Sequence, residues 1–165
     1  MTGPAIRTDI IDVYVFRRGH RSRGVEFLQL RRSSGTLAKT WHPVMGHIEP
    51  GETATAAALR ELAEETGYRP EDGLLGFWQL ERVNTYFLAR LDAVMMSPCF
   101  AAEADPNITP NLDEAHDQVR WVGHDHIDRT FMWPGQRQAT DEILREVISP
   151  DSIASAVLRI DWSDR

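Results

Sequence analysis

Two stretches near the start of the chain, residues 9–16 and 25–30, are rich in β-branched and aromatic residues. The polar segment 17–24 separates them. β-branched and aromatic side chains favour strands, and a polar break between two such runs favours a reversal of the chain. The pattern therefore predicts a β-hairpin.

The clearest helical pattern spans residues 53–66, where apolar residues recur at spacings of three and four. These residues are Ala54, Ala58, Leu59, Leu62 and Ala63. Thr53 can cap the amino terminus of such a helix, and Gly67 stands where a left-handed carboxyl-terminal cap is usual. Periodicity and caps together predict one uninterrupted helix.

Four further runs have strand character: residues 41–48, 74–80, 83–91 and 118–122. A second helix is expected over residues 136–148, where apolar side chains again recur at helical spacing. Residues 97–113 hold several prolines, and we expect a long loop there of the kind that carries substrate contacts. Strands flanked by two helices predict an α/β fold with the helices layered on a mixed β-sheet.

The size and composition of the chain favour a small cytoplasmic protein. Most domains contain about 100 to 200 residues, so we expect residues 1–165 to form a single domain. Cys99 is the one cysteine, so no internal disulfide can form, and the first residues lack the apolar run of a secretory leader. No apolar stretch approaches the roughly 20 residues that a membrane span requires.

The formal net charge of −7 argues against duplex nucleic acid as a partner, because proteins that bind it concentrate lysine and arginine on one face. An acidic protein can still bind an anionic small molecule where divalent metal ions neutralise a local group of carboxylates. The placement of the carboxylates therefore matters more than the total charge.

Three carboxylates share one side of the first predicted helix, since Glu61, Glu64 and Glu65 stand at positions i, i+3 and i+4. Carboxylate oxygens suit hard cations such as Mg²⁺ or Mn²⁺. A solvated helix surface would also tolerate the trio, because repulsion between exposed like charges costs only about 0.2 to 0.5 kcal/mol per pair. The trio alone does not decide between a metal site and a charged surface.

The residues around the trio decide in favour of a metal site. Gly46 is followed after five residues by Glu52 and after seven more by Arg60, and the segment ELAEETG follows directly. This spacing resembles the Nudix box, G-x5-E-x7-R-E-U-x-E-E-x-G-U, in which U is a bulky aliphatic residue. Every fixed position matches, and Leu62 satisfies the first U. Tyr68 replaces the last aliphatic residue, and we expect it to be half-buried and to alter only the packing.

The resemblance to Nudix hydrolases implies an α/β/α sandwich and an enzyme that depends on Mg²⁺, with Mn²⁺ as the alternative ion. It implies that Glu61, Glu64 and Glu65 bind the divalent ions and that Glu64 and Glu65 take part in catalysis.

The remaining box residues have supporting roles in the family. The resemblance implies that Arg60 belongs to the catalytic set and orients an acidic neighbour, whereas a simple ion pair with Glu64 is the alternative. Glu52 would stabilise the loop and the metal-binding residues without contacting the metal itself. Gly46 would permit a close approach to the backbone beside the substrate phosphates.

The family's reaction is attack of water on one phosphorus of a diphosphate, with a glutamate near the metals as general base. The best candidate for the base outside the helix is Glu114. The alternatives are Asp113, Asp117 and Glu103, or a solvated acidic turn without a catalytic role.

A weaker resemblance bears on that choice. The order of Glu114, His116 and Trp121 is similar to bacterial dihydroneopterin-triphosphate and nucleoside-triphosphate pyrophosphohydrolases of the family. Ala115, however, stands where those relatives carry their glutamate. On a strand, a displacement by one residue turns a side chain to the opposite face, whereas a loop can still bring Glu114 in.

Several residues outside the box are candidates for substrate contacts. Arg31 and Arg32 end the second predicted strand near the place where the family binds phosphates; alternation turns one of them to solvent, and we assign Arg31 to the substrate. Trp41 can stack on a base or a pterin, or pack in the core. His47, like Gly46, is placed beside the phosphates.

The sequence thus predicts a hydrolase that cleaves the diphosphate bond of a nucleoside or pterin triphosphate, or of a related nucleoside-diphosphate derivative. The alternatives are an asymmetric dinucleoside polyphosphate hydrolase and a Nudix-shaped sensor that binds a nucleotide without cleaving it. The expected partner is a small nucleotide-like molecule, and a homodimer is an open option because members of the family often dimerise.

Overall fold

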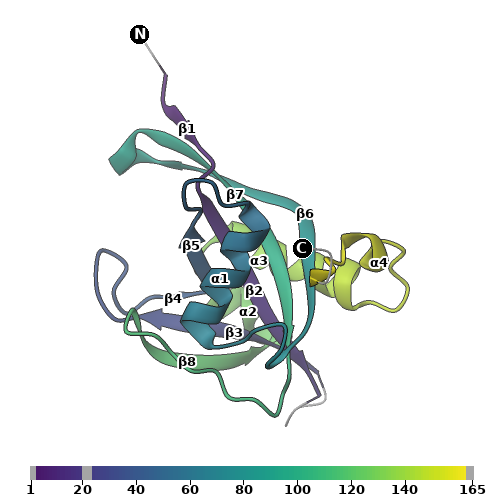
Figure 1. Ribbon diagram of the computed structural model, residues 1–165. Helices are drawn as coiled ribbons and strands as arrows, with labels where there is room; N and C mark the ends of the chain where they lie inside the picture. Colours follow the sequence, from purple (N-terminus) through teal and green to yellow (C-terminus); the bar gives the residue numbers. More distant parts are fainter. Residues whose placement is uncertain (1–2, 20–23, 163–165) are drawn as a thin grey trace.

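The computed structural model describes residues 3–19 and 24–162 and consists of one mixed β-sheet with helices on both faces. Helix α1 covers one face, and α2 and α3 lie on the other (Figure 1). The strands are β1 (Ala5–Arg7), β2 (Ile10–Arg18), β3 (Val25–Arg32), β4 (Trp41–His42), β5 (Val44–His47), β6 (Leu74–Leu88), β7 (Ala93–Ala104) and β8 (His116–Gly123). The helices are α1 (Ala54–Thr66), α2 (Ile127–Thr130), α3 (Pro134–Glu142) and α4 (Ser155–Leu158).

The backbone of the sheet runs in the order β1-β7-β2-β3-β4. Strand β7 pairs in parallel with β1 and β2, and every other pairing in the described sheet is antiparallel. Strand β5 pairs with β2, β6 with β7, and β8 with β3. The predicted α/β/α sandwich with a mixed sheet is confirmed.

Strict alternation along β2 divides the core into two layers. Ile11, Val13 and Val15 pack beneath α1, whereas Tyr14 and Phe16 pack beneath α3. The predicted hairpin is confirmed, because β2 and β3 pair antiparallel; residues 20–23 of its connection lie outside the described residues.

Helix α1 begins and ends where its caps predict. The Thr53 side chain accepts a hydrogen bond from the Ala56 N–H at 3.2 Å. Gly67 adopts the left-handed conformation, with φ of 80°, and its N–H bonds to the Ala63 carbonyl at 2.9 Å. The helix therefore stops at a fixed point, which sets where the next segment starts.

The prediction of a long loop over residues 97–113 is wrong in its first half. Residues 97–104 belong to β7, whose side chains are buried on both faces of the sheet: Phe100 and Ala102 on the α1 side, Cys99 and Ala101 on the other. A strand buried on both sides shows no alternation, and alanine has low strand propensity. Pro98 is tolerated because the β6–β7 pairing is irregular there. Only residues 105–115 remain as a loop.

Three other predicted boundaries change in detail. The runs 74–80 and 83–91 form the single long strand β6 with an irregularity between Gln79 and Val83, followed by a short 3-10 turn. The run 41–48 splits at Pro43 into β4 and β5. The last predicted helix is confirmed as α3, continued by the π-helical segment η3 (Ile143–Ile148). None of the described helices is long and apolar enough to cross a membrane.

Asp12 is a carboxylate buried in the layer beneath α3. Its side chain is 3% exposed, and Asn84 Nδ2 donates a hydrogen bond to Oδ2 at 2.6 Å. Oδ1 has no partner among the described residues. Burial raises the pKa of Asp12 to about 6, although hydrogen bonds from Asn84 and Ser97 oppose the shift. The folded protein therefore keeps the Asp12 proton to a higher pH than an exposed aspartate would.

We predict that Asp12→Asn makes the protein more stable at neutral pH than the wild type. Because the folded-state pKa lies above the ordinary value of 3.8, the contribution of Asp12 to stability is present below about pH 4 and is lost as the pH rises through about 6. As the pH rises from below about 4 to above about 6, the free energy of unfolding of the wild type should therefore fall by about 3 kcal/mol relative to that of Asp12→Asn. Urea unfolding across the pH range measures the difference.

The exposed Asp128→Asn provides the control and should follow the wild type at every pH. A constant difference between wild type and Asp12→Asn from low to high pH would show that ionisation of Asp12 is not the cause.

Candidate functional site

The loop between β5 and α1 folds back on itself before the helix begins. Gly51 has φ of 84°, which a residue with a side chain rarely adopts, and the Glu52 N–H bonds to the Glu49 carbonyl at 2.9 Å. The Glu52 carboxylate in turn accepts from the Glu49 N–H at 3.0 Å. This closed turn fixes the Glu52 side chain against α1.

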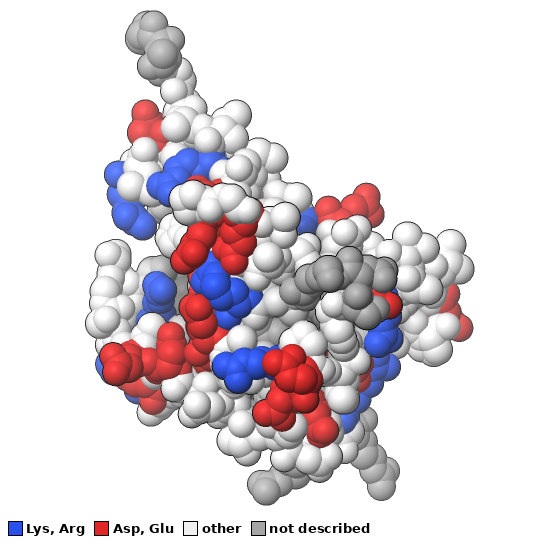
Figure 2. All heavy atoms as spheres, in the orientation of Figure 1, with Lys and Arg blue, Asp and Glu red and all other residues white. Residues whose placement is uncertain are grey.

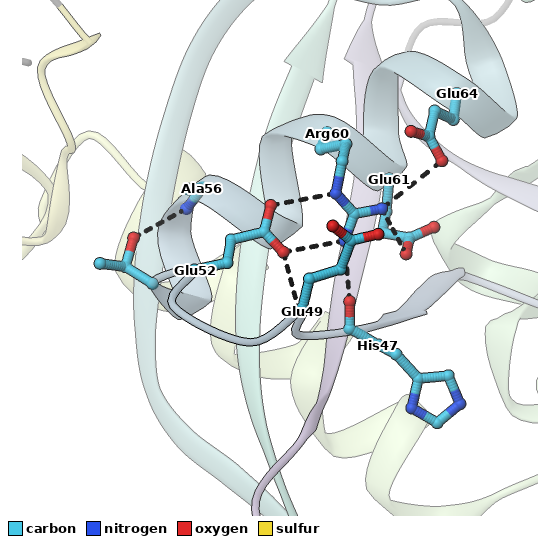
Figure 3. A network of polar contacts seen from close by, with 8 residues as sticks. His47, Glu49, Glu52, Ala56, Arg60, Glu61 and Glu64 are labelled. Atoms are coloured by element: carbon cyan, nitrogen blue, oxygen red, sulfur yellow. Dashed lines mark hydrogen bonds and ion pairs between the residues drawn. The ribbon is translucent and has the colours of Figure 1, made fainter.

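Arg60 joins this loop to the helix (Figure 3). Its Nε and Nη2 donate to the two oxygens of Glu52 at 3.0 and 2.9 Å, a bidentate pair, and Nη2 also donates to the His47 carbonyl at 2.8 Å. Nη1 donates to Glu61 at 2.8 Å. The distance from Nη1 to Glu64 is 3.5 Å, so the simple pair with Glu64 is the weakest of these contacts.

The charges in this network stabilise one another. The pKa of Arg60 is raised by its hydrogen bonds to Glu52 and Glu61, and the pKa of Glu52 is lowered chiefly by its bond to Arg60. Figure 2 shows acidic side chains gathered over α1 and the preceding loop, with basic atoms between them. The structure thus places Arg60 and Glu52 where they can orient Glu61 and hold the loop.

Gly46 leaves room for the Glu61 side chain. A Cβ atom at position 46 would lie 1.9 Å from Cδ and 2.2 Å from Oε1 of Glu61. Gly46 pairs with Ile11, whose side chain lies beneath α1, so position 46 faces the same helix. The close approach expected at this glycine is therefore made by a carboxylate of the same chain.

Glu65 is the most deeply buried carboxylate of the trio. The residue is 6% exposed, and Oε2 has no hydrogen-bond partner among the described residues. Burial raises the pKa of Glu65 to about 8, and the charges of Glu61 and Asp113 add to the shift. A hydrogen bond from the Met45 backbone and the charge of Arg32 oppose it.

The donor set fits a divalent cation at Glu61 and Glu65. The site offers only oxygen donors, and one carboxylate oxygen of Glu65 has no partner among the described residues. A hard cation binds such oxygens, and its charge would offset the repulsion between carboxylates that helps to raise the pKa of Glu65. Among the described residues, no three His, Cys, Asp or Glu side chains stand close enough together to form a complete metal site. Glu64 is the outlying member, with a side chain that is 58% exposed.

The loop before β8 brings Asp113 toward the trio and leaves Glu114 outside. Asp113 acts electrostatically on Glu65, and its Oδ1 lies 2.8 Å from Nδ1 of the buried His116. The Glu114 side chain is exposed, and the Ser33 hydroxyl donates a hydrogen bond to the Glu114 backbone carbonyl. No local pattern could predict this difference, because it depends on the path of the loop.

Tyr68 is fully buried and not half-buried as predicted. It is 1% exposed, and its hydroxyl donates to the Ile108 carbonyl at 2.9 Å. The Asn111 N–H bonds to the Thr66 carbonyl at 2.8 Å in the same region. The tyrosine that departs from the box pattern therefore ties the loop 105–115, which carries Asp113, to the end of α1.

The structure does not bring Arg31 and Trp41 to the carboxylates. They pair with each other across β3 and β4 on the face opposite α1, as the alternation from Leu30 requires. Arg31 Nε lies 2.8 Å from Asp117, and the guanidinium carbon of Arg120 lies 3.9 Å from the centre of the Trp41 ring. Arg120 therefore lies over the Trp41 ring, and the assignment of Trp41 to the substrate stays a prediction.

His47 points away from the helix, with a side chain that is 70% exposed and 3.7 Å from Asp9. Its backbone carbonyl is the part that contacts Arg60. We assigned Arg31 to the substrate, but its neighbour Arg32 is the arginine on the α1 side of the sheet. The signal was available in the sequence, since Leu28 and Leu30 mark the core side of the strand.

Comparison with known proteins identifies the family. The NUDIX domain family matches residues 7–143, and the chain belongs to this family. The mouse bis(5'-nucleosyl)-tetraphosphatase (asymmetrical) is 34% identical over 99 residues, which cover 60% of this chain and 65% of the mouse protein. The chain thus spans about two thirds of the length of this curated relative.

Two solved structures share the fold. An Ap4A hydrolase of C. elegans in a binary complex has a TM-score of 0.69 at 18% identity, covering 84% of this chain and 96% of that one. A NUDIX hydrolase from Listeria monocytogenes has a TM-score of 0.67 at 21% identity, with coverages of 83% and 92%.

We predict that Gly46→Ala displaces the Glu61 carboxylate without unfolding the protein, because the clashing atoms are the end of a flexible side chain. Because Arg60 would then no longer hold Glu61 in position, the affinity for Mn²⁺ should fall by about 10- to 100-fold. Titration of Mn²⁺ followed by electron paramagnetic resonance measures the affinity.

The control is the same substitution in a Glu61→Ala background, where it should have little further effect on Mn²⁺ affinity. An equal loss in both backgrounds would contradict the proposed link between Gly46 and Glu61.

Proposed function

We propose that this chain is a metal-dependent hydrolase that cleaves a diphosphate linkage in a nucleotide-like small molecule. The observation that supports the proposal is the close approach of the Glu61 carboxylate to Gly46, with Arg60 and Glu52 holding Glu61 in place. Next to Glu61 on the same helix side lies the buried carboxylate of Glu65, one oxygen of which has no partner among the described residues. This arrangement orders carboxylate oxygens next to a bend of the backbone, in a chain that belongs to the NUDIX domain family.

Glu61 and Glu65 would hold Mg²⁺ or Mn²⁺, with Glu64 as the outer ligand. A divalent ion bound there would lower the pKa of a water molecule and offset negative charge on phosphate oxygens. Arg60 keeps Glu61 in place, and Glu52 keeps Arg60 in place. Asp113, oriented by His116, is the loop carboxylate best placed to accept a proton near Glu65; Glu114 is the alternative.

The names of the relatives favour one substrate class. The mouse, rat and pig proteins are asymmetrical bis(5'-nucleosyl)-tetraphosphatases, so we place dinucleoside polyphosphates first among the candidates. Nucleoside and pterin triphosphates, favoured by the order of His116 and Trp121, come second. We propose further that residues 1–165 act as one domain; the homodimer and the cytoplasmic location stay predictions of the sequence.

The deciding experiment is product analysis with purified protein and Mg²⁺. Release of ATP and AMP from diadenosine tetraphosphate supports asymmetric cleavage, whereas diphosphate released from a nucleoside or pterin triphosphate supports the second class. Binding of these nucleotides without any metal-dependent turnover would replace the hydrolase by a sensor.

We predict that Glu65→Gln lowers kcat by at least about 100-fold while the fold is retained, because the change removes a metal ligand and keeps the shape of the side chain. Steady-state kinetics and thermal unfolding measure the two effects. The exposed Glu71→Gln is the matched control and should keep the wild-type rate. A Glu65→Gln variant with wild-type kcat would remove Glu65 from the site.

We also predict that Asp113→Asn lowers kcat by about 10-fold or more, with a smaller effect for Glu114→Gln. The reason is that the charge of Asp113 acts on Glu65, whereas the Glu114 side chain is exposed to solvent. Steady-state rates of the two neighbouring variants give a direct comparison. The reverse order of effects would return the role of base to Glu114.

A further inference from the structure

Strand β6 pairs with β7 on one side, and the chain covers only part of its other, outer edge. The Ile160 N–H bonds to the Phe77 carbonyl at 2.8 Å. Farther along the strand, the Glu142 carboxylate accepts from the Glu81 and Arg82 N–H groups at 2.8 and 3.4 Å. A row of unpaired backbone groups is a template for another strand, so covering it prevents pairing. The outer edge of β6 is therefore protected as far as residue 82.

Residues 83–88 continue the same edge without such protection. Val83 stands opposite Pro98 of β7, which has no N–H to donate, so the backbone N–H and carbonyl of Val83 point outward. Alternation gives Thr85 and Phe87 the same orientation. Among the described residues, these outward groups have no hydrogen-bond partner. Figure 1 shows this end of the β6–β7 hairpin projecting, beside β1, beyond helix α1.

The free segment has the composition of a strand that is meant to pair. Its sequence, VNTYFL, contains neither a charged residue nor a proline, which are two devices that block pairing at an edge. Valine, threonine, tyrosine and phenylalanine all favour strands. Val83, Tyr86 and Phe87 are nevertheless 42%, 39% and 58% exposed. Strand-forming side chains and open backbone groups thus occur together, which indicates a strand as the partner.

The exposed apolar surface extends from this edge across three strands. Phe87 pairs with Val94 of β7, and Val94 pairs with Ile6 of β1, so the three side chains share one face of the sheet. Met96 lies on the same face, two residues after Val94. Ile6 and Met96 are 71% and 37% exposed. The row ends at the free edge with Phe87, where the side chains of an added strand would continue it.

We propose that residues 83–88 form a homodimer interface, in which two copies of β6 pair antiparallel and join the two sheets into one. The inference goes beyond the proposed function and does not rest on it. Two identical edges related by a two-fold axis pair antiparallel, and the assembly closes at two copies. Each copy supplies outward N–H and carbonyl groups at alternate residues, so the two edges satisfy each other.

The side chains select the register of this pairing. With Thr85 opposite its own copy, Val83 of each chain stands opposite Phe87 of the other. Pairs of threonines and pairs of an aromatic with a β-branched residue both stabilise antiparallel strands. If Thr85 stood opposite Phe87 instead, Arg82 of one copy would approach Arg90 of the other, and like charges repel. The opposite shift would put Phe87 against the acidic residue that precedes Arg82.

Sedimentation equilibrium of the full chain tests the dimer. The wild type should have twice the mass of one chain at micromolar concentrations. Thr85→Lys should raise the dimer Kd by at least about 100-fold, because two like charges would meet at the axis, and Thr85→Glu should do the same. Mixing the two variants should restore a dimer, because opposite charges then meet. The control is Val157→Lys, at an apolar position that is 81% exposed, and it should behave as the wild type.

A cross-link tests the register. Thr85→Cys places two cysteines opposite each other at the axis, where paired Cα atoms lie about 5.5 Å apart, within the range of a disulfide. Mild oxidation should therefore link two copies of this variant, whereas Val157→Cys should run as a single chain on a denaturing gel. The native Cys99 is buried and should not react. Thermal unfolding checks that each variant is folded.

Three results would overturn the proposal: a wild type that stays monomeric, a dimer whose Kd is unchanged in Thr85→Lys, or a dimer that Thr85→Cys does not cross-link. A monomer that binds a strand of a different protein along this edge would likewise replace the second copy. None of these measurements involves turnover, so failure of the proposed hydrolase would leave them unaffected.

Discussion

The bidentate pair between Arg60 and Glu52 is the interaction on which the site depends. One guanidinium contacts a carboxylate of the loop, a backbone carbonyl of β5 and a carboxylate of α1. Its charge offsets the repulsion between acidic groups that the fold crowds onto one helix and its loop. Isolated surface pairs contribute little, but a planar fork that satisfies several acceptors at once fixes geometry as well as charge. The position of Glu61 over Gly46 follows from this contact.

Buried contacts, and not ion pairs, hold the carboxyl-terminal end of α1 in place. Gly67 stops the helix, and Tyr68 enters the core and bonds to the Ile108 carbonyl. The loop that carries Asp113 is thereby attached to the same helix that carries Glu65. A bulky residue at position 68 would fill the same space, but an aliphatic one has no hydroxyl with which to hold the loop.

The sheet separates two kinds of surface. On the side of the sheet that α1 covers, Arg32 pairs with His116, and Glu61 and Glu65 belong to the helix itself. The opposite face carries Trp41, with the guanidinium group of Arg120 over its ring and that of Arg31 farther from it. This division follows from alternation, because neighbouring residues of a strand point to opposite sides. Arg31 and Arg32, adjacent in the chain, therefore have different partners.

The hairpin, the limits of α1, the layered α/β arrangement and the residues of the box could all be predicted from the amino-acid sequence. Each of these depends on spacings within a short segment, and caps and periodicity act over the same distances. Three features became visible only in the packed chain: residues 97–104 form an inner strand, Asp113 and not Glu114 contacts the buried His116, and Arg32 has no carboxylate partner among the described residues. A strand buried on both faces has no alternation to reveal it, and the direction of a loop side chain is set by contacts with segments distant in sequence. Local pattern carries no information about such contacts, because they exist only once the whole chain has packed.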